Sequence, residues 1–419
     1  MSNELKDKNV DAVDDIFHSD AQKYTALQTQ RLFVPNRVWD QVRDPTRNRL
    51  LYGVPGSGKT IALKRLSWPA MVSDPVFLPG RKFVAFYCDL RDLARITTTL
   101  DSPIFRQDDP DRTNTARIFE FGSSLHLLIE MAADLIEASE GAEANPEFRS
   151  LQEVLVSSVL EFCDRSFGLH DLGSLGELWQ QLLDLKNDFF DALYDAQSLD
   201  EILEACYVPM RPLQFAHSIH LQFQKRRSNV RLAWLLDQFE TLPFFYQRPL
   251  NSLLTREASS FCFTVGASTP YSFNPHSTEG PLKTVADFEL TSCEYFVGEE
   301  EEYLHLLNYA WERLGTDGQP LHSVLLGGPR YLASMSARSV RRFLEFCRNC
   351  NAHRAGVSTM ISKETQRDVV QGAATAVQED LHTGGDIPQG ALWGLATTTL
   401  VQNRSELKTL LWPAPAGGR

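Results

Sequence analysis

The eight residues from Gly53 to Thr60 constrain this chain more than any other stretch. They match the phosphate-binding pattern of two fixed glycines, a lysine and a hydroxyl residue. The glycines allow backbone angles that turn successive N–H groups towards a phosphate. Residues 48–52 predict a buried strand before the loop, and 61–66 predict a helix whose positive N-terminus faces the anion. We therefore predict a nucleoside triphosphate site at Val54, Pro55, Gly56, Ser57, Gly58, Lys59 and Thr60.

Two residues of the loop and one distant aspartate predict a magnesium-dependent site. Lys59 brings a charge to the β- and γ-phosphates, and the Thr60 hydroxyl is suited to ligate Mg²⁺. The apolar run 230–236 leads directly into Asp237, whose carboxylate would be fixed by a buried strand at the Mg²⁺ shell. Glu240 is the carboxylate predicted to polarise the attacking water, and Gln238 could only orient it. Alternatively, Glu240 only caps the following segment.

Composition limits the class of protein. A length of 419 residues suggests two or three domains, and 43% hydrophobic with 23% charged residues is typical of a soluble globular protein. The sequence has no apolar run near the roughly 20 residues that span a bilayer. The polar N-terminus lacks a signal core, and seven scattered cysteines favour reduced thiols. We therefore predict a cytoplasmic protein without a membrane partner.

Charge argues against unspecific nucleic-acid binding by the whole molecule, because its net charge is −13 and its pI is near 5.3. A local basic patch could override this at 225–227 or at Arg338, Arg341, Arg342 and Arg348; solvated helix faces are the alternative. Cys347, Cys350 and His353 form a C-x-x-C-x-x-H cluster. This cluster is either a zinc site or two ordinary helix cysteines, since no second ligand pair is evident.

The pattern along the chain predicts an α/β fold with a helical insertion. Further strands are expected at 82–88, 260–265 and 287–290, and helices at 121–136, 150–162, 174–193 and 249–258. We predict a five-stranded parallel P-loop sheet with a large helical insertion and a C-terminal helical lid. The predicted divisions are a flexible or loosely attached segment at 1–30, a nucleotide-binding domain at 31–114 and 225–295, an insertion at 115–224, a lid at 296–360 and a helical or partial winged-helix segment at 361–419. The helical stripes of the insertion are interpreted as an ordinary core.

Three further segments supply candidate site residues. Phe33 and Val34 form an apolar island before the first strand and are candidates for an adenine pocket. Thr269 follows the strand predicted at 260–265 and could contact the γ-phosphate or the lytic water. Arg330 follows Gly-Gly-Pro and would project from a helix start, where it could reach a phosphate.

Taken in order, these pieces resemble the AAA+ ATPases, and among them the origin-recognition-complex-like group. The resemblance runs from about residue 33 to 332, interrupted by the insertion. Residues 53–60 match Walker A, Asp237 matches the Walker B aspartate, Ser268 and Thr269 fall at sensor 1, and 327–330 look like sensor 2. The resemblance implies ATP with Mg²⁺, hydrolysis, and an arginine finger from a neighbouring subunit in a homo-oligomer. For that finger Arg248 and Arg256 are available, and we favour Arg256; the alternative is a surface arginine that pairs with Glu257 or a nearby carboxylate.

Two departures from the family pattern bear on function. Gln238 stands where the family has glutamate, and Asp-Gln-Phe-Glu looks like the Walker B motif of STAND signalling ATPases. The segment after the lid is short for a complete DNA-binding winged helix. One hypothesis is therefore an ATPase that loads or remodels nucleic acid or a partner protein, including a DNA-binding, origin-recognition-like role in replication or transposition. The other is a nucleotide-dependent switch for an effector protein, in a bacterial multi-protein system such as anti-phage defence, by analogy alone.

Overall fold

A computed structural model of the chain describes residues 24–373 with internal gaps. The gaps are 36–37, 44–46, 75–82, 170–173, 197, 206–209, 227–229, 257–261, 270–271, 285, 294–298, 314–323, 327, 337–338, 353–360, 364 and 372. The predicted C-terminal segment therefore lies largely outside the described residues, and so does the question of a partial winged helix. None of the described helices is both long and apolar enough to cross a membrane.

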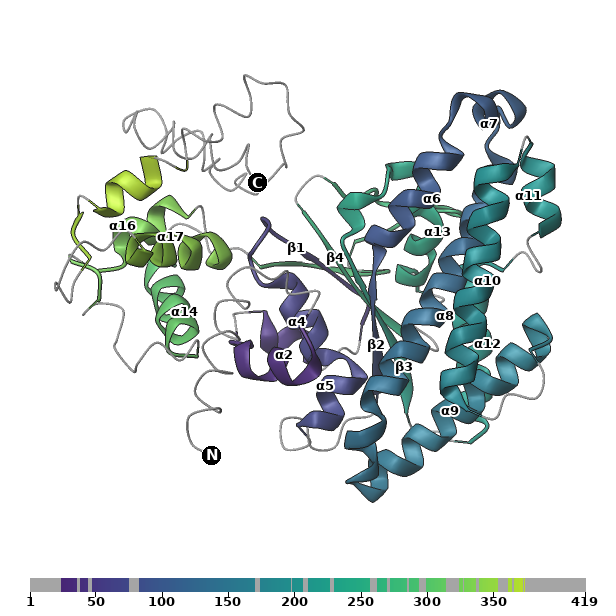
Figure 1. The fold of residues 1–419 in the computed structure, drawn as a ribbon, viewed down its shortest axis with the longest axis horizontal. Coiled ribbons are helices and arrows are strands. Elements are labelled where there is room, and N and C mark those ends of the chain that lie inside the picture. Colours follow the sequence, from purple (N-terminus) through teal and green to yellow (C-terminus); the bar gives the residue numbers. More distant parts are fainter. Residues whose placement is uncertain are drawn as a thin grey trace.

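A parallel sheet of five strands forms the centre of the molecule, with the strand order β2-β3-β4-β1-β7 (Figure 1). This confirms the predicted fold class. The strands read as continuous apolar runs because helices cover both faces of a parallel sheet. Their bounds are β1 Arg49–Tyr52, β2 Phe83–Asp89, β3 Arg231–Asp237, β4 Cys262–Ser268 and β7 Glu289–Ser292. The last strand begins two residues later than predicted, where Glu289 pairs with Arg49.

Parallel strands bring their carboxyl ends to one edge of the sheet, so the segments after β1, β3 and β4 meet there. The loop after β1 leads into helix α4, Lys59–Leu66, which is followed by α5, Trp68–Ser73. Helix α2, Ala26–Leu32, begins with a capping box at Thr25. Lys64 donates to the backbone oxygen of Tyr24 at 2.8 Å, and Glu137 accepts from the N–H of Ala26 at 2.8 Å. Residues 24–32 are therefore attached to the molecule through α2 and the residues before it, and residues 1–23 lie outside the described part.

The helical insertion joins β2 to β3 and shares one apolar core with the sheet. Its longest helix, α8, packs along β2, and Phe121 of α8 meets Phe189 of α10 edge-on. The stripes seen in the sequence are thus core positions, as we expected. The helices start before the predicted boundary at 115, because two short ones follow β2 directly. Their bounds are α6 Leu93–Leu100, α7 Pro103–Asp108, α8 Thr113–Glu143, α9 Pro146–Phe167, α10 Leu175–Asp195, α11 Leu199–Ala205 and α12 Pro212–Gln224.

The prediction of a helix at 249–258 is wrong. Helix α13 spans Phe244–Asn251 with Pro249 inside it, and a 3₁₀ turn follows at Ser252–Leu254. The predicted start at Pro249 falls inside the observed helix. Here Pro243 caps the helix instead, and Tyr246 and Leu250 bury its apolar face. Short elements complete this part of the chain: α3 Trp39–Val42, 3₁₀ turns at Leu90–Asp92 and Phe239–Thr241, and the hairpin strands β5 His276–Ser277 and β6 Gly280–Pro281.

A second apolar core belongs to the C-terminal helices. It lies mostly within the range predicted for the lid, and Ile361, Val369 and Val370 extend it into the segment predicted at 361–419. Helices α14, Glu300–Arg313, α16, Arg330–Met335, and α17, Val340–Ala352, pack around it and lie to the left of the sheet in Figure 1. Cys347 and Cys350 are buried in this core, and burial raises the pKa of both thiols, that of Cys350 to about 11. Among the described residues no cluster could hold a metal ion, and His353 lies outside them. Their burial makes both cysteines part of this core, and the zinc alternative is not tested, because it includes His353.

Candidate functional site

The loop between β1 and α4 has the geometry of a phosphate cradle. Gly56 and Gly58 take φ values of +82° and +92°, which residues with a side chain rarely adopt. These angles let the chain curl before α4 begins at Lys59. The ammonium of Lys59 is buried against the loop, donating to the backbone oxygens of Gly53 at 2.7 Å and Val54 at 3.2 Å. The lysine is thus held where the loop amides and the start of α4 converge.

Asp237, at the end of β3, is fully buried beside the loop helix. Its carboxylate accepts from the phenol of Tyr87 at 3.0 Å and from the N–H of Gln238 at 2.9 Å, and it is hydrogen-bonded to the Thr60 side chain. Burial raises the pKa of Asp237, whereas the Thr60 hydrogen bond and the charge of Lys59 oppose that rise. The structure thus brings together the hydroxyl and carboxylate that the sequence suggested for one magnesium ion.

Glu240 lies in the 3₁₀ turn that follows β3. Gln238 enters this turn with a left-handed φ of +67°, which directs the chain back over the edge of the sheet. The carboxylate of Glu240 accepts from the N–H of Thr269, and burial raises its pKa against the opposing charge of Lys59. It does not cap the next helix, because α13 has Pro243 at its cap and no side-chain cap bond. The alternative of a capping role for Glu240 is therefore not supported.

Three buried polar atoms in this neighbourhood have no hydrogen-bond partner among the described residues. They are Ser57 Oγ in the loop, Glu240 Oε2 after β3 and Thr269 Oγ1 after β4. Leaving a buried polar group unpaired costs about 1–3 kcal/mol, so such atoms usually have a partner. Other orphaned atoms occur elsewhere in the chain, but these three sit around one loop. A polar ligand there would supply the missing partners, which fits a nucleotide with its metal ion.

The lid touches the phosphate loop through the N-terminus of α17. The N–H of Val340 donates to the backbone oxygen of Gly56 at 3.1 Å. A Cβ built on Gly56 would lie 2.3 Å from Ser339 Oγ and 3.0 Å from Arg341 Cβ, so only glycine fits beneath this contact. The Cβ of Arg341 therefore lies next to Gly56 of the phosphate loop. Sequence reasoning missed this residue because it treated the arginine run as a basic surface, although Ser339 before Val340 is a recognisable helix start.

Arg330 occupies a different position from the one expected of it. It pairs with Glu301 of α14, and both side chains are largely exposed, at 75% and 78%. No contact of the described residues links Arg330 to the loop, whereas Arg341 has its Cβ against Gly56. Of these two lid arginines, Arg341 is therefore the one that lies against the phosphate loop.

The other candidates are spread around the sheet. Phe33 packs on Trp39 in the main core, with ring centroids 4.4 Å apart, while Val34 packs against the core of the lid. The pair therefore bridges the two cores. Arg256 follows the 3₁₀ turn after α13, and its N–H donates to Asp287 at 3.3 Å, at the edge of the sheet opposite the phosphate loop. Its alternative partner, Glu257, lies outside the described residues.

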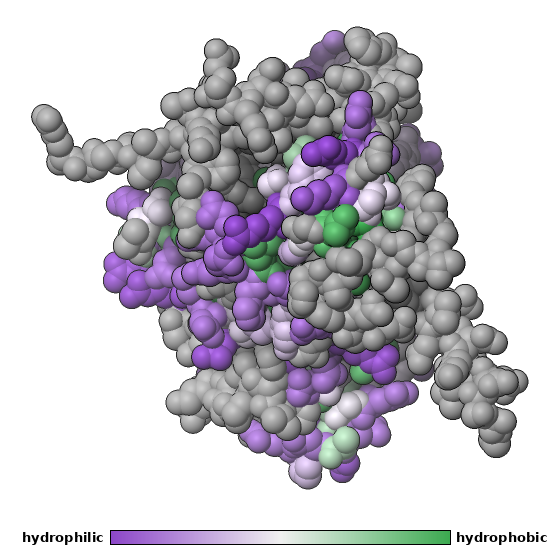
Figure 2. Space-filling view, turned by 90° about the vertical axis from the view of Figure 1, so that its left-hand side faces the viewer, coloured by the Kyte–Doolittle hydropathy of each residue, from purple (hydrophilic) through white to green (hydrophobic). Residues whose placement is uncertain are grey.

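The candidate basic patches are weaker than their sequence suggests. Arg226 pairs with Glu161 at 3.2 Å, and Lys225 donates to Gln222 at 3.0 Å. Arg342 is largely buried, and burial lowers its pKa. Arg227 and Arg338 lie outside the described residues. On the lid side the described surface is mostly hydrophilic, with only small apolar areas (Figure 2).

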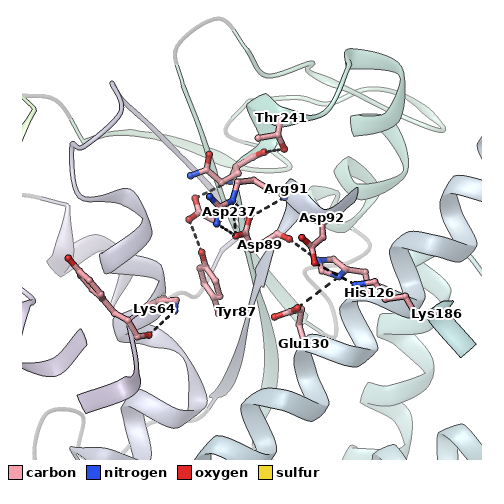
Figure 3. A network of polar contacts seen from close by, with 12 residues as sticks. Lys64, Tyr87, Asp89, Arg91, Asp92, His126, Glu130, Lys186, Asp237 and Thr241 are labelled. Carbon is pink, nitrogen blue, oxygen red and sulfur yellow. Dashed lines mark hydrogen bonds and ion pairs between the residues drawn. The ribbon is translucent and has the colours of Figure 1, made fainter. Parts of the chain in front are cut away.

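A polar network extends from Asp237 towards the helical insertion (Figure 3). Arg91 forms a two-pronged pair with Asp89 at the end of β2, and His126 of α8 donates through Nε2 to the backbone oxygen of Asp89 at 2.7 Å. Lys186 of α10 reaches Asp92 at 3.5 Å. The carboxyl end of β2 and the turn after it are therefore tied to α8 and α10 of the insertion.

A parallel sheet in this strand order, with a phosphate loop after β1, a buried aspartate ending β3 and a helical lid, defines a P-loop protein of the AAA+ class. A sequence model of the family described as ORC-CDC6-like matches residues 17–303, more than half of the chain. The chain therefore belongs to the ORC-CDC6-like family.

Two further comparisons add little. A solved structure of the Aeropyrum pernix Orc1 protein in complex with DNA is similar at 11% sequence identity and a TM-score of 0.39, covering 90% of this chain and 82% of that one. No curated protein matches the chain.

Proposed function

We propose that this protein binds ATP with Mg²⁺ and hydrolyses it, acting as a nucleotide-dependent switch or remodeller in a bacterial multi-protein system. The observation that carries the proposal is the convergence of Lys59, Thr60, Asp237 and Glu240 around a glycine loop. Buried polar atoms without partners surround the same loop. In P-loop enzymes the bound metal ion neutralises charge that develops on the phosphoryl oxygens.

Each residue of the site has a proposed role. Lys59 leaves the loop carbonyls to pair with the phosphates, and Thr60 and Asp237 hold the metal ion. Glu240 takes a proton from the attacking water, because it is a buried carboxylate whose raised pKa suits a general base. The Thr269 hydroxyl orients that water or the γ-phosphate, and the Ser57 hydroxyl completes the cradle. Phe33 and Val34 border the base.

Slow turnover, typical of a switch, is supported by one feature of the site. Gln238 carries no charge where the family has a glutamate, so general-base work falls to Glu240 alone. Regulation of an effector in anti-phage defence remains an analogy drawn from the STAND-like motif.

DNA binding is the second candidate function, favoured by the family to which the chain belongs. The Orc1 structure named above contains DNA, but the net charge of −13 and the paired arginines of this chain oppose a general affinity. The effect of duplex DNA on the rate of ATP hydrolysis tests whether the protein loads or remodels DNA.

The proposed function predicts measurable ATP binding and turnover by the purified protein. Calorimetry with ATP and Mg²⁺ should detect one site per chain, and phosphate release should require Mg²⁺. Adding duplex DNA at low salt should leave the rate within about twofold if the protein is a switch for a protein effector. A large, salt-sensitive stimulation would support the DNA-binding alternative, since phosphate contacts weaken as salt rises. Absence of ATP binding at millimolar concentration contradicts the proposal.

The lid contact predicts that Arg341, and not Arg330, acts on bound ATP. Arg341→Ala should lower the turnover rate by about tenfold or more, since an arginine that stabilises charge on the γ-phosphoryl group can contribute far more than that. Arg330→Ala is the matched control, because it removes an exposed arginine from the same lid. The measurement is steady-state phosphate release at saturating ATP. Equal loss in both variants, or loss only in Arg330→Ala, would return the role to Arg330.

We further propose that the protein works as an oligomer in which Arg256 reaches the neighbouring subunit's site. Arg256 lies at the edge of the sheet away from its own loop, so any role in hydrolysis must be played in another subunit. Turnover per subunit that rises with protein concentration supports this assembly.

A further inference from the structure

The phenol of Tyr87 reaches the proposed magnesium ligand from the neighbouring strand. Its hydroxyl donates to Oδ2 of Asp237 at 3.0 Å, while the N–H of Gln238 holds Oδ1 at 2.9 Å (Figure 3). Each carboxylate oxygen has two lone-pair sites and can still accept another partner. These two bonds and the bond to the Thr60 side chain fix the plane of the carboxylate without occupying all of its acceptor capacity. An apolar ring would fill the same buried position on β2, so the hydroxyl is not needed for packing alone.

Tyr87 is itself held by the helical insertion. Its backbone N–H donates to Oδ2 of Asp134 at 2.9 Å, and Asp134 lies half-buried on α8. The ammonium of Lys64, on the phosphate-loop helix, lies 5.2 Å from the centre of the Tyr87 ring. The residue is thus contacted by the loop helix, by β3 and by the insertion at once.

We propose that Tyr87 is a positioning residue for the magnesium ligand Asp237, and that Asp134 of the insertion keeps Tyr87 in place. The inference rests on the proposed function, since it concerns the metal ion that the site would hold. Hydrogen bonds to metal ligands orient them, and their loss typically weakens metal binding by about 10–100-fold. The helical insertion is then a structural part of the magnesium site and not only a surface for partners.

Tyr87→Phe tests the first half of the inference, because it removes one oxygen and keeps the ring. Binding of a fluorescent ATP analogue is measured over a series of Mg²⁺ concentrations and in EDTA. The Mg²⁺ concentration for half-maximal binding should rise by about tenfold or more, while binding in EDTA stays within about twofold of the wild type. The matched control is Tyr246→Phe, which also loses a buried hydroxyl bonded to a carboxylate, that of Asp101 at 2.8 Å. The control should show no shift.

Two variants of Asp134 test the second half. Asp134→Ala leaves the N–H of Tyr87 without its acceptor and should shift the Mg²⁺ dependence in the same direction. Asp134→Asn keeps an acceptor oxygen for that N–H, so its binding of the ATP analogue should show the same Mg²⁺ dependence as the wild type. Thermal unfolding establishes that each variant is folded. If Tyr87→Phe does not fold, the comparison of Asp134→Ala with Asp134→Asn tests the inference in its place.

The outcomes separate this inference from the proposed function. An unchanged Mg²⁺ dependence in folded Tyr87→Phe, or equal weakening in EDTA, overturns the positioning role. A shift in Tyr87→Phe without one in Asp134→Ala overturns the role of the insertion. A wild-type protein that binds no nucleotide at any Mg²⁺ concentration contradicts the proposed function instead.

Discussion

Replacing Lys59 by alanine should weaken ATP binding by about 100-fold or more. The ammonium lies buried at the centre of the loop, where it donates to the backbone oxygens of Gly53 and Val54. A hydrogen bond between charged groups contributes up to about 3 kcal/mol, and each 1.4 kcal/mol corresponds to about tenfold in Kd. The loop should survive, because its curl depends on the backbone angles of Gly56 and Gly58 and not on the lysine. Calorimetric titration with ATP and Mg²⁺ measures the effect.

The matched control is Lys225→Ala, which removes a lysine from the end of the insertion, where it bonds only to Gln222 among the described contacts. Its affinity for ATP should equal that of the wild type. If Lys59→Ala binds ATP as tightly as this control, the loop does not cradle phosphates, and the proposed function loses its main support.

The sequence sufficed for those parts of the site that depend on neighbours along the chain. The phosphate loop needs glycine, lysine and hydroxyl residues at fixed spacing, and Asp237 needs only an apolar strand before it. Both can be recognised locally because a buried strand reads as an unbroken apolar run. The same reasoning placed Thr269 level with the strand end at Asp237, since adjacent parallel strands end at one edge of the sheet. In the structure the N–H of Thr269 donates to Glu240.

The contacts that escaped prediction join segments far apart in the chain. Tyr87 and Asp237 are separated by 150 residues, and nothing in the run around Tyr87 distinguishes its ring from those of neighbouring core residues. Arg341 meets Gly56 only because the lid folds back over the loop. Arg330 was favoured because a proline before an arginine is a strong local signal for a helix start. That helix does begin there, but it points the arginine to Glu301.

The misplaced helix at 249–258 shows how a local rule can fail against packing. A proline inside α13 gives up a backbone hydrogen bond, which usually costs about 3 kcal/mol or more in a helix. Burial of Tyr246 and Leu250 on either side of it favours the helix nonetheless. Gln247 also donates to the backbone oxygens of Phe239 and Leu242, which fastens α13 to the turn that contains Glu240. The position of Glu240 thus depends on a helix whose bounds the sequence did not predict.

Glu240→Gln should lower the rate of ATP hydrolysis by about 10²–10⁴-fold, the usual contribution of a general base, while ATP still binds. Glutamine keeps the size of the side chain and an oxygen that can accept from the N–H of Thr269. It adds no charge to a buried position, so the fold should be retained. Because the amide cannot take a proton from water, the variant should hold ATP without converting it. Single-turnover phosphate release and nucleotide analysis of the bound fraction measure both effects.

Gln238→Ala distinguishes a general base at Glu240 from a residue that only orients the water. The change removes the polar side chain directly after Asp237 and leaves Glu240 in place. Its backbone N–H still donates to Asp237, although the left-handed φ of +67° is less favourable for alanine. The rate should fall by no more than about tenfold, the order of a single neutral hydrogen bond. Wild-type turnover in Glu240→Gln would mean that Glu240 is structural. A loss confined to Gln238→Ala would then identify Gln238 as the residue that orients the water, and slow hydrolysis without a general base would be the behaviour of a switch.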